Sequence, residues 1–271
     1  MVSVKASFAY LLFALLAIIL FLYLLFPGQA VKAYMDSRLV AIDPSLALIA
    51  DTIRPAVPPG LKMTDVDLNR DSVRLAHIDE ARISPDLTSL LRANKQARFQ
   101  ARLADGTIKG RATLEGESGS AGRLRVEADL SQIRLEQLDA VQAASRFTLS
   151  GTLGGRLTHD GGRAPMGITN GVLTVAGMRI ALKSPFLGIS ELDLGQTEAE
   201  FSVGGQILNL KALSFNGPML EGKISGTIDV ARPYGQSRLN LTGTAKPRPE
   251  LIAQLQETLP EGIVNSRTLA S

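Results

Sequence analysis

Apolar and polar residues alternate one by one through much of the chain, and this pattern constrains the fold more than any other feature of the sequence. It is plain in residues 98–103 and again in 107–114, which are separated by Asp105-Gly106, a dipeptide favoured in tight hairpin turns. Successive side chains of a strand point to opposite faces of a sheet, so each strand has one apolar and one polar face. Fully buried parallel strands would instead read as unbroken apolar runs. The sequence therefore predicts a mostly antiparallel sheet.

The same alternation returns several times further along the chain, at 124–130, 147–157, 178–182, 199–203, 220–230 and 239–245. Residues that favour the start of a helix, such as Pro85-Asp86 and Pro249-Glu250, interrupt it. We expect short helices over 87–94, 135–145 and 249–259. The predicted fold class is mainly β, with an antiparallel β-rich domain built as a curved sheet or a sandwich and carrying a few short helices.

A long uncharged segment precedes the alternating part of the chain. Residues 6–26 contain no charged side chain and are rich in Leu, Ile and Phe, while Tyr10 and Tyr23 lie near the two ends and Lys5 comes just before. About 20 apolar residues suffice to span a bilayer, and aromatic rings favour its interfaces. A cleaved signal peptide is the alternative, but its apolar core runs to only about 7–15 residues. We predict one uncleaved transmembrane helix with its N-terminus in the cytoplasm.

The sequence divides into three parts on these grounds. Residues 1–30 are the predicted transmembrane anchor. Residues 31–60 are predicted to form a juxtamembrane helix and a linker, because an uneven helical pattern in 31–50 is followed by the proline-rich stretch 54–60. Residues 61–271 are the predicted β-rich domain.

Composition and charge exclude several classes of function. The formal net charge is +3, and the 29 basic residues are spread among 26 acidic ones, so we expect no nucleic-acid-binding surface. The chain has no cysteine, which excludes disulfides, thiolate metal sites and cysteine nucleophiles.

The sequence contains only incomplete versions of known binding motifs. Residues 217–224 have the spacing of a phosphate-binding loop, but Ile224 stands where such a loop needs Ser or Thr. Lys223 lies in a strand pattern and not at the start of a helix. The two histidines, His77 and His159, have acidic neighbours but no third ligand or orienting partner in the sequence, so we interpret them as surface or turn residues.

Serine and aspartate patterns are also incomplete. The serines at 150, 190 and 225 lie in no Gly-x-Ser-x-Gly sequence. Asp65, Asp67 and Asp71 lack the loop glycine and terminal glutamate of an EF-hand, and we interpret them as a polar strand face with its turn. The sequence therefore predicts no catalytic, cofactor-binding or metal-binding residues, no cofactor and no enzymatic activity.

Glycines recur on the apolar side of the predicted strands. The segments 149–153 and 224–228 share the pattern apolar-Ser-Gly-Thr-apolar, and Gly243 occupies a similar position. A strand glycine lets a backbone or a ligand approach closely. We expect Gly151, Gly226 and Gly243 to mark either ordinary close packing or room for apolar chains.

Several segments together resemble a known family. They are 86–91, 101–106, 215–218 and 222–228. In these segments the chain resembles type II secretion system protein N (GspN), and its Gly-x-Ile-x-Gly-x-Ile strands look like AsmA-type domains. The resemblance implies a single-pass protein of the bacterial inner membrane, with its AsmA-like β domain in the periplasm and an accessory part in the export of folded proteins. It supplies no catalytic residues.

Two functions follow as expectations. The first is a non-enzymatic accessory or scaffold component of the type II secretion system, with the bilayer around residues 6–26 and other secretion components as its partners. The second is a periplasmic AsmA-like lipid-handling protein with an apolar trough. A sheet face that is closed by other elements favours the first function, and an open apolar face favours the second.

Overall fold

The computed structural model describes most of the chain after the first 24 residues. The described residues are 10, 13–14, 17, 21, 23, 25–42, 45–57, 59–70, 73–116, 122–144, 147–162, 167–186, 188–231 and 236–258.

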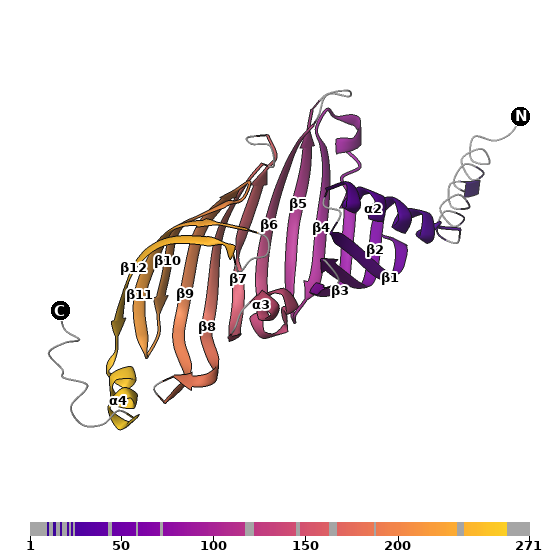
Figure 1. Ribbon diagram of the computed structural model, residues 1–271. Helices are drawn as coiled ribbons and strands as arrows, with labels where there is room; N and C mark the ends of the chain where they lie inside the picture. Colours follow the sequence, from indigo (N-terminus) through magenta and orange to yellow (C-terminus); the bar gives the residue numbers. More distant parts are fainter. Residues whose placement is uncertain are drawn as a thin grey trace, which may run out of the picture.

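Twelve strands form one open sheet, and each strand pairs antiparallel with the next along the chain (Figure 1). The strands are β1 (Leu46–Ala56), β2 (Gly60–Arg70), β3 (Val73–Pro85), β4 (Lys95–Leu103), β5 (Gly106–Glu115), β6 (Arg123–Arg134), β7 (Thr148–Asp160), β8 (Ile168–Phe186), β9 (Ile189–Gly204), β10 (Ile207–Asn216), β11 (Leu220–Asp229) and β12 (Arg238–Pro247). The mainly β, antiparallel prediction is confirmed. The described strands form a single layer, so the sandwich alternative is wrong.

The predicted hairpin between β4 and β5 is confirmed, with Leu103 opposite Gly106. Its two turn residues are Ala104 and Asp105, and both have positive φ, at 49° and 60°. Two consecutive residues of this kind give a turn whose twist matches that of the strands. The glycine of the predicted Asp-Gly pair is therefore the first residue of β5 and not part of the turn itself.

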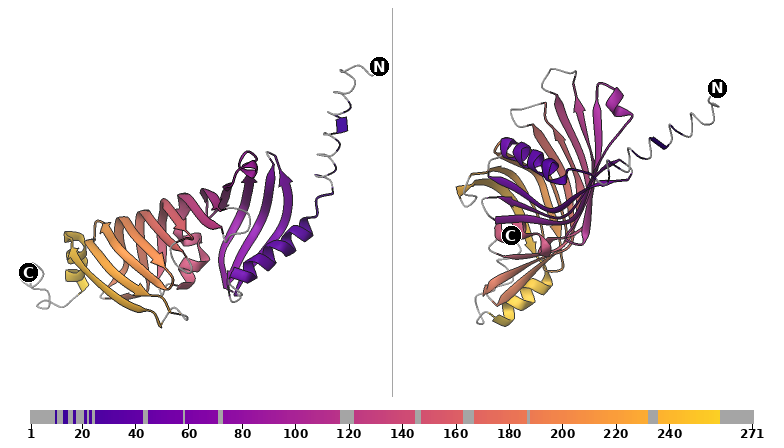
Figure 2. Two further views of the ribbon diagram at one scale, coloured as in Figure 1. Left: turned by 90° about the horizontal axis from the view of Figure 1, so that it is seen from above. Right: turned by 90° about the vertical axis from the view of Figure 1, so that its right-hand side faces the viewer.

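Register shifts recur across the sheet. They fall between Leu130 and Ile133 in β6, between Val175 and Met178 in β8 and between Leu210 and Leu213 in β10. An extra residue of this kind bends its strand and increases the local twist. The strands accordingly fan around the long axis of the sheet (Figure 2, right).

Four short helical elements and one longer helix accompany the sheet: α2 (Gly28–Ile42), the 3-10 turns η1 (Ser89–Leu91) and η2 (Leu135–Gln137), α3 (Asp139–Ala144) and α4 (Pro249–Thr258). The helix expected over 249–259 is confirmed, and the one expected over 135–145 is divided between η2 and α3. The helix expected over 87–94 is wrong, because only η1 forms there. The Asp86 carboxylate accepts hydrogen bonds from the Thr88 amide and hydroxyl at 3.0 and 2.8 Å, which tightens the turn, and Arg92 is already extended.

The linker predicted over 54–60 is wrong as well. The helix expected after residue 31 is present as α2, but β1 follows and runs to Ala56, and Val57 and Pro59 are turn residues before β2. Pro55 is compatible with a strand because β1 is an edge strand, where no second neighbour needs its missing N–H. The sheet therefore begins at Leu46 and not at residue 61.

Most of the predicted anchor, residues 6–26, lies outside the described residues, and the anchor stays a prediction. Within it, the described residues Tyr10, Phe13, Phe21 and Tyr23 are helical and exposed. Among the helices formed by described residues, none combines the length and the apolar character needed to cross a bilayer.

Candidate functional site

One face of the sheet, which we call the apolar face, is apolar from strand to strand. A single cross-strand row illustrates it: Pro55, Leu61, Ile83, Phe99, Gly110, Ala128, Leu157, Gly171 and Phe201. The row crosses nine neighbouring strands and contains no polar side chain. Neighbouring strands lie about 4.8 Å apart, so the row is roughly 40 Å long.

The apolar face continues through the last three strands. Leu213, Ile224 and Gly243 face one another there, as do Leu208, Ile228 and Leu239. Leu239 and Leu241 on β12 remain 66% and 39% exposed. The apolar surface therefore extends to the open edge of the sheet.

Phenylalanine rings fill the space above three glycines of this face. Phe99 lies over Gly110, Phe201 over Gly171 and Phe215 over Gly222, where each ring occupies the position that a side chain on the neighbouring glycine would take. These cross-strand pairs keep the face continuous, because the ring covers backbone that glycine leaves bare.

Of the two alternatives for Gly151, Gly226 and Gly243, close packing is the one that the structure supports. A side chain on Gly226 would meet the Asn240 carbonyl, and one on Gly243 would meet the Lys223 carbonyl. Gly151 lies against Val175 and has a φ of +138°. Glycine at these positions lets neighbouring strands pack closely and leaves no space for a ligand. Any ligand of the apolar face would therefore contact the side chains around them.

Helices cover the apolar face at its two ends. At the first end, Met35 of α2 packs against the buried cluster of Ala50, Met63 and Val66. At the other, Leu251 and Leu255 of α4 pack with Ile189 and Met219. Between these ends, α3 lies at the lower edge of the sheet (Figure 1), and together with η2 it contacts β7 near the buried Ile133. Away from this edge the described residues form no second layer, so they leave the central part of the face open.

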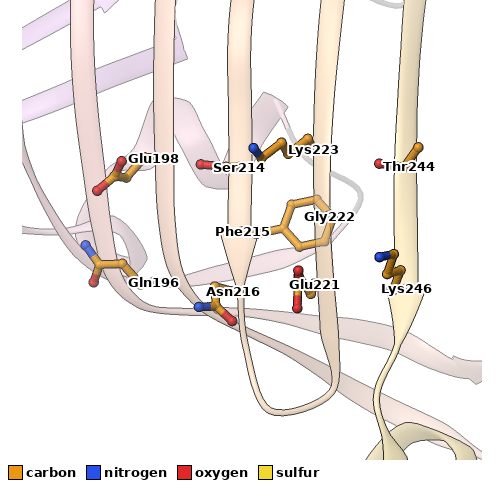
Figure 3. A pocket seen from close by; sticks show the side chains of 10 residues that line it. All are labelled: Gln196, Glu198, Ser214, Phe215, Asn216, Glu221, Gly222, Lys223, Thr244 and Lys246. Atoms are coloured by element: carbon orange, nitrogen blue, oxygen red, sulfur yellow. The ribbon is translucent and has the colours of Figure 1, made fainter.

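The opposite face, which we call the polar face, is charged and exposed. Cross-strand ion pairs follow it: Arg125 with Glu115 at 3.0 Å, Arg156 with Asp129 at 2.7 Å, Lys211 with Glu200 at 2.8 Å and Arg248 with Glu221 at 3.0 Å. A hollow of about 480 Å³ on β9 to β12 carries both lysines and glutamates (Figure 3). The sheet is thus amphipathic, and the polar face is the one suited to water.

The histidines, which are the side chains best suited to metal or acid–base chemistry, lie apart from each other. His77 lies on the polar face with its Nδ1 2.7 Å from Asp67 Oδ1 and its Nε2 3.9 Å from Asp79 Oδ1, and its side chain is 41% exposed. His159 Nδ1 is 2.9 Å from the Thr169 hydroxyl. The described part of the chain contains no group of three or more residues placed to hold a metal ion.

The other candidates of the sequence analysis occupy separate strands. Ser150, Ser190 and Ser225 lie on β7, β9 and β11, and Asp71 lies outside the described residues. Lys223 is inside β11, which confirms that it opens no helix. The apolar face is the candidate site that remains.

A one-layer, amphipathic antiparallel sheet is the class of structure that these observations define. No protein-family model, no curated protein and no solved structure matches the chain.

Proposed function

We propose that the protein handles lipid and that the apolar face holds acyl chains. The observation that carries this proposal is the open apolar row across the sheet. An acyl chain has no hydrogen-bonding groups, so it suits a surface that offers none. One leaflet of a bilayer is about 15 Å deep, so a row of roughly 40 Å has room for more than one acyl chain along it.

Two neighbouring residues of β12 allow a direct test. Leu241 lies on the apolar face and Asn240 on the polar face, and both are exposed. A photoreactive amino acid at 241 in the full chain, in vesicles with radiolabelled phospholipid, should form lipid adducts. The same group at 240 is the matched control and should form few. Equal labelling at the two positions would reject the proposal.

A charge on the same surface gives an independent test. Leu239→Glu and Leu241→Glu together should remove the lipid adducts of a photoreactive group at Ile224. Both side chains are exposed, so these substitutions should leave folding intact, as circular dichroism can check. Unchanged labelling in the folded variant would place the bound lipid elsewhere.

We also propose that the protein is anchored in the bacterial inner membrane by residues 6–26, with its sheet in the periplasm. The support is the length of the uncharged segment and the lysine that precedes it. Protease added to spheroplasts should digest the sheet and leave a small protected fragment. Complete protection of the sheet would reverse this topology.

An accessory, non-enzymatic role in type II secretion is a second proposal, and it rests on the sequence resemblance and on one feature of the sheet. Residues 238–246 of β12 are all exposed, and among the described strands β12 has a neighbour on one side only. An open edge of this kind is a template for adding a strand from another chain. Deleting the protein from a bacterium that uses this system should leave exported proteins in the periplasm. Normal export would argue against this role.

A further inference from the structure

Three exposed apolar side chains, which we call the apolar tips, project from one end of the sheet. Val57 lies in the turn between β1 and β2, and Leu87 and Leu91 lie in the connection between β3 and β4. They are 84%, 53% and 93% exposed. The two connections are neighbours, since Gly60 lies against Ser84, and Pro59 and Leu87 line the same hollow.

The N-terminal segment enters the fold at this same end. Gly28, the first residue of α2, lies against the carbonyl of Ile53, near the end of β1. Tyr23 and Leu25, just before α2, are 53% and 70% exposed. The apolar tips and the apolar N-terminal segment therefore lie at the same end of the sheet.

Basic residues lie behind the apolar tips on the polar face. Arg54, Lys62 and Arg82 are direct cross-strand neighbours, and Lys109 follows two strands further on. Like charges directly opposite one another destabilise a sheet unless anions compensate them. Glu80 is the compensating carboxylate, and Lys62, Arg82 and Arg102 share it at 3.0, 2.6 and 2.9 Å. Arg54 and Lys109 form no ion pair with a described residue, so the row carries surplus positive charge.

A hollow of about 440 Å³ joins the cations to the apolar tips. Arg82, Arg98 and Lys109 line it together with Leu87. Asp86 is the one acidic residue among the lining residues, and its carboxylate offsets one of the three positive charges. The hollow therefore keeps a net positive charge beside an exposed leucine, which is the combination that a phospholipid headgroup and its acyl chains require.

We propose that this end of the sheet docks on the surface of an anionic bilayer. The apolar tips enter the interface, and the cations Arg54, Lys62, Arg82, Arg98 and Lys109, which we call the basic rim, contact the headgroup phosphates. The bilayer is the one into which the N-terminal segment inserts. Docking would hold the sheet against the membrane at its β1 end, whether or not the apolar face holds acyl chains.

The cysteine-free chain allows labels at single sites. The full chain, reconstituted in phosphatidylcholine vesicles with or without phosphatidylglycerol, would carry an environment-sensitive fluorophore on Val57→Cys or Leu91→Cys. Both labels should shift to shorter wavelength and be quenched by lipid-borne quenchers when the anionic lipid is present. Val172→Cys is the matched control, since Val172 is an apolar residue of β8 with 53% exposure and should stay in water.

Removing the basic rim tests the charge contribution separately. Arg82→Gln, Arg98→Gln and Lys109→Gln should each lower the docked population about fivefold, and added salt should do the same. If the labels at 57 and 91 show the same emission wavelength and the same quenching as the label at 172, the proposal is wrong. Equal membrane contact in vesicles without anionic lipid would show that the basic rim does not contribute to docking. Neither result depends on lipid adducts at Leu241, so this proposal and the acyl-chain proposal can fail independently.

Discussion

At Gly226 the backbone conformation and the neighbouring strand both require glycine. Its φ is +139°, and a Cβ would meet the backbone of Asn240 and Leu241 on β12. We predict that Gly226→Leu lowers the free energy of unfolding by about 1–3 kcal/mol, because both strain and overpacking oppose it. Thr227→Leu, one position along and exposed, is the control and should be mild. Denaturant titration of the two variants compares them, and a wild-type midpoint for Gly226→Leu would disprove this strand register.

Gly171 offers a different test, because only side chains fill the space beside it. A Cβ there would meet the rings of Phe201 and the side chain of Leu157, with no backbone atom among its nearest contacts. Gly171→Ala should therefore destabilise the wild-type protein and be better tolerated when Phe201→Ala has opened the space. We expect a coupling energy of about 0.5–3 kcal/mol in a double-mutant cycle of unfolding free energies. Strictly additive effects would show that the ring does not cover this glycine.

At the scale of elements, the strands predicted from the sequence are those whose alternation is unbroken. Strands β4 to β7, β11 and β12 and parts of β8 and β9 were predicted in this way, whereas β1, β3 and β10 were not. In the missed strands and in β2, irregular residues break the alternation. Met63 and Val66 share a buried cluster although they are three residues apart, because Asp65 between them has a φ of 51°. Such spacing is also typical of a helix, so alternation alone does not reveal this strand.

The candidate site was predictable only in part, for a related reason. Alternation predicts that an apolar face exists, but whether another layer covers it depends on contacts between residues far apart in the sequence. Only the structure therefore reveals that the centre of the face is open. The apolar tips were not predicted either, because Leu87 and Leu91 were assigned to a helix that does not form.

Glu80 stabilises the junction of β2, β3 and β4, and its contribution should depend on pH. Hydrogen bonds from Lys62 and then Arg82 hold the pKa of its carboxyl below the usual value. A depressed pKa in the folded state stabilises the protein above the unfolded-state pKa, and this stabilisation is lost as the pH falls through the folded value. Glu80→Gln should therefore be less stable than wild type at pH 7, by about 1 kcal/mol.

The difference in stability between wild type and Glu80→Gln should disappear in acid, where the Glu80 carboxyl of the wild type is protonated and neutral. Thermal unfolding at several pH values would measure it, and a gap that persists at the lowest pH would mean that Glu80 acts through packing and not through charge. Glu80→Gln also removes the one acid shared by Lys62, Arg82 and Arg102. The same variant should therefore bind anionic vesicles more strongly than wild type does, which links this element to the basic rim.

At the scale of the whole molecule, a single-layer sheet lacks the second layer that normally buries an apolar face. Two helices cover the ends of this face, and the residues that the structure describes leave its centre open. Contiguous apolar surfaces that no other layer covers commonly mark sites of interaction. The fold therefore fits a protein whose apolar face is completed by something it binds.

This conclusion predicts that lipid stabilises the protein. A ligand that binds the folded state alone raises the free energy of unfolding by RT ln(1 + [L]/Kd), which is about 2.7 kcal/mol at one hundred times Kd. The melting temperature of the full chain should rise with phospholipid concentration. The combined Leu239→Glu and Leu241→Glu variant should have the wild-type melting temperature without lipid. Its melting temperature should rise less when lipid is added, because both side chains are exposed on the apolar face.

Loss of the basic rim should instead reduce only the rise in melting temperature that anionic lipid causes. A wild-type melting temperature that does not change with lipid concentration would contradict the proposal that the apolar face holds acyl chains.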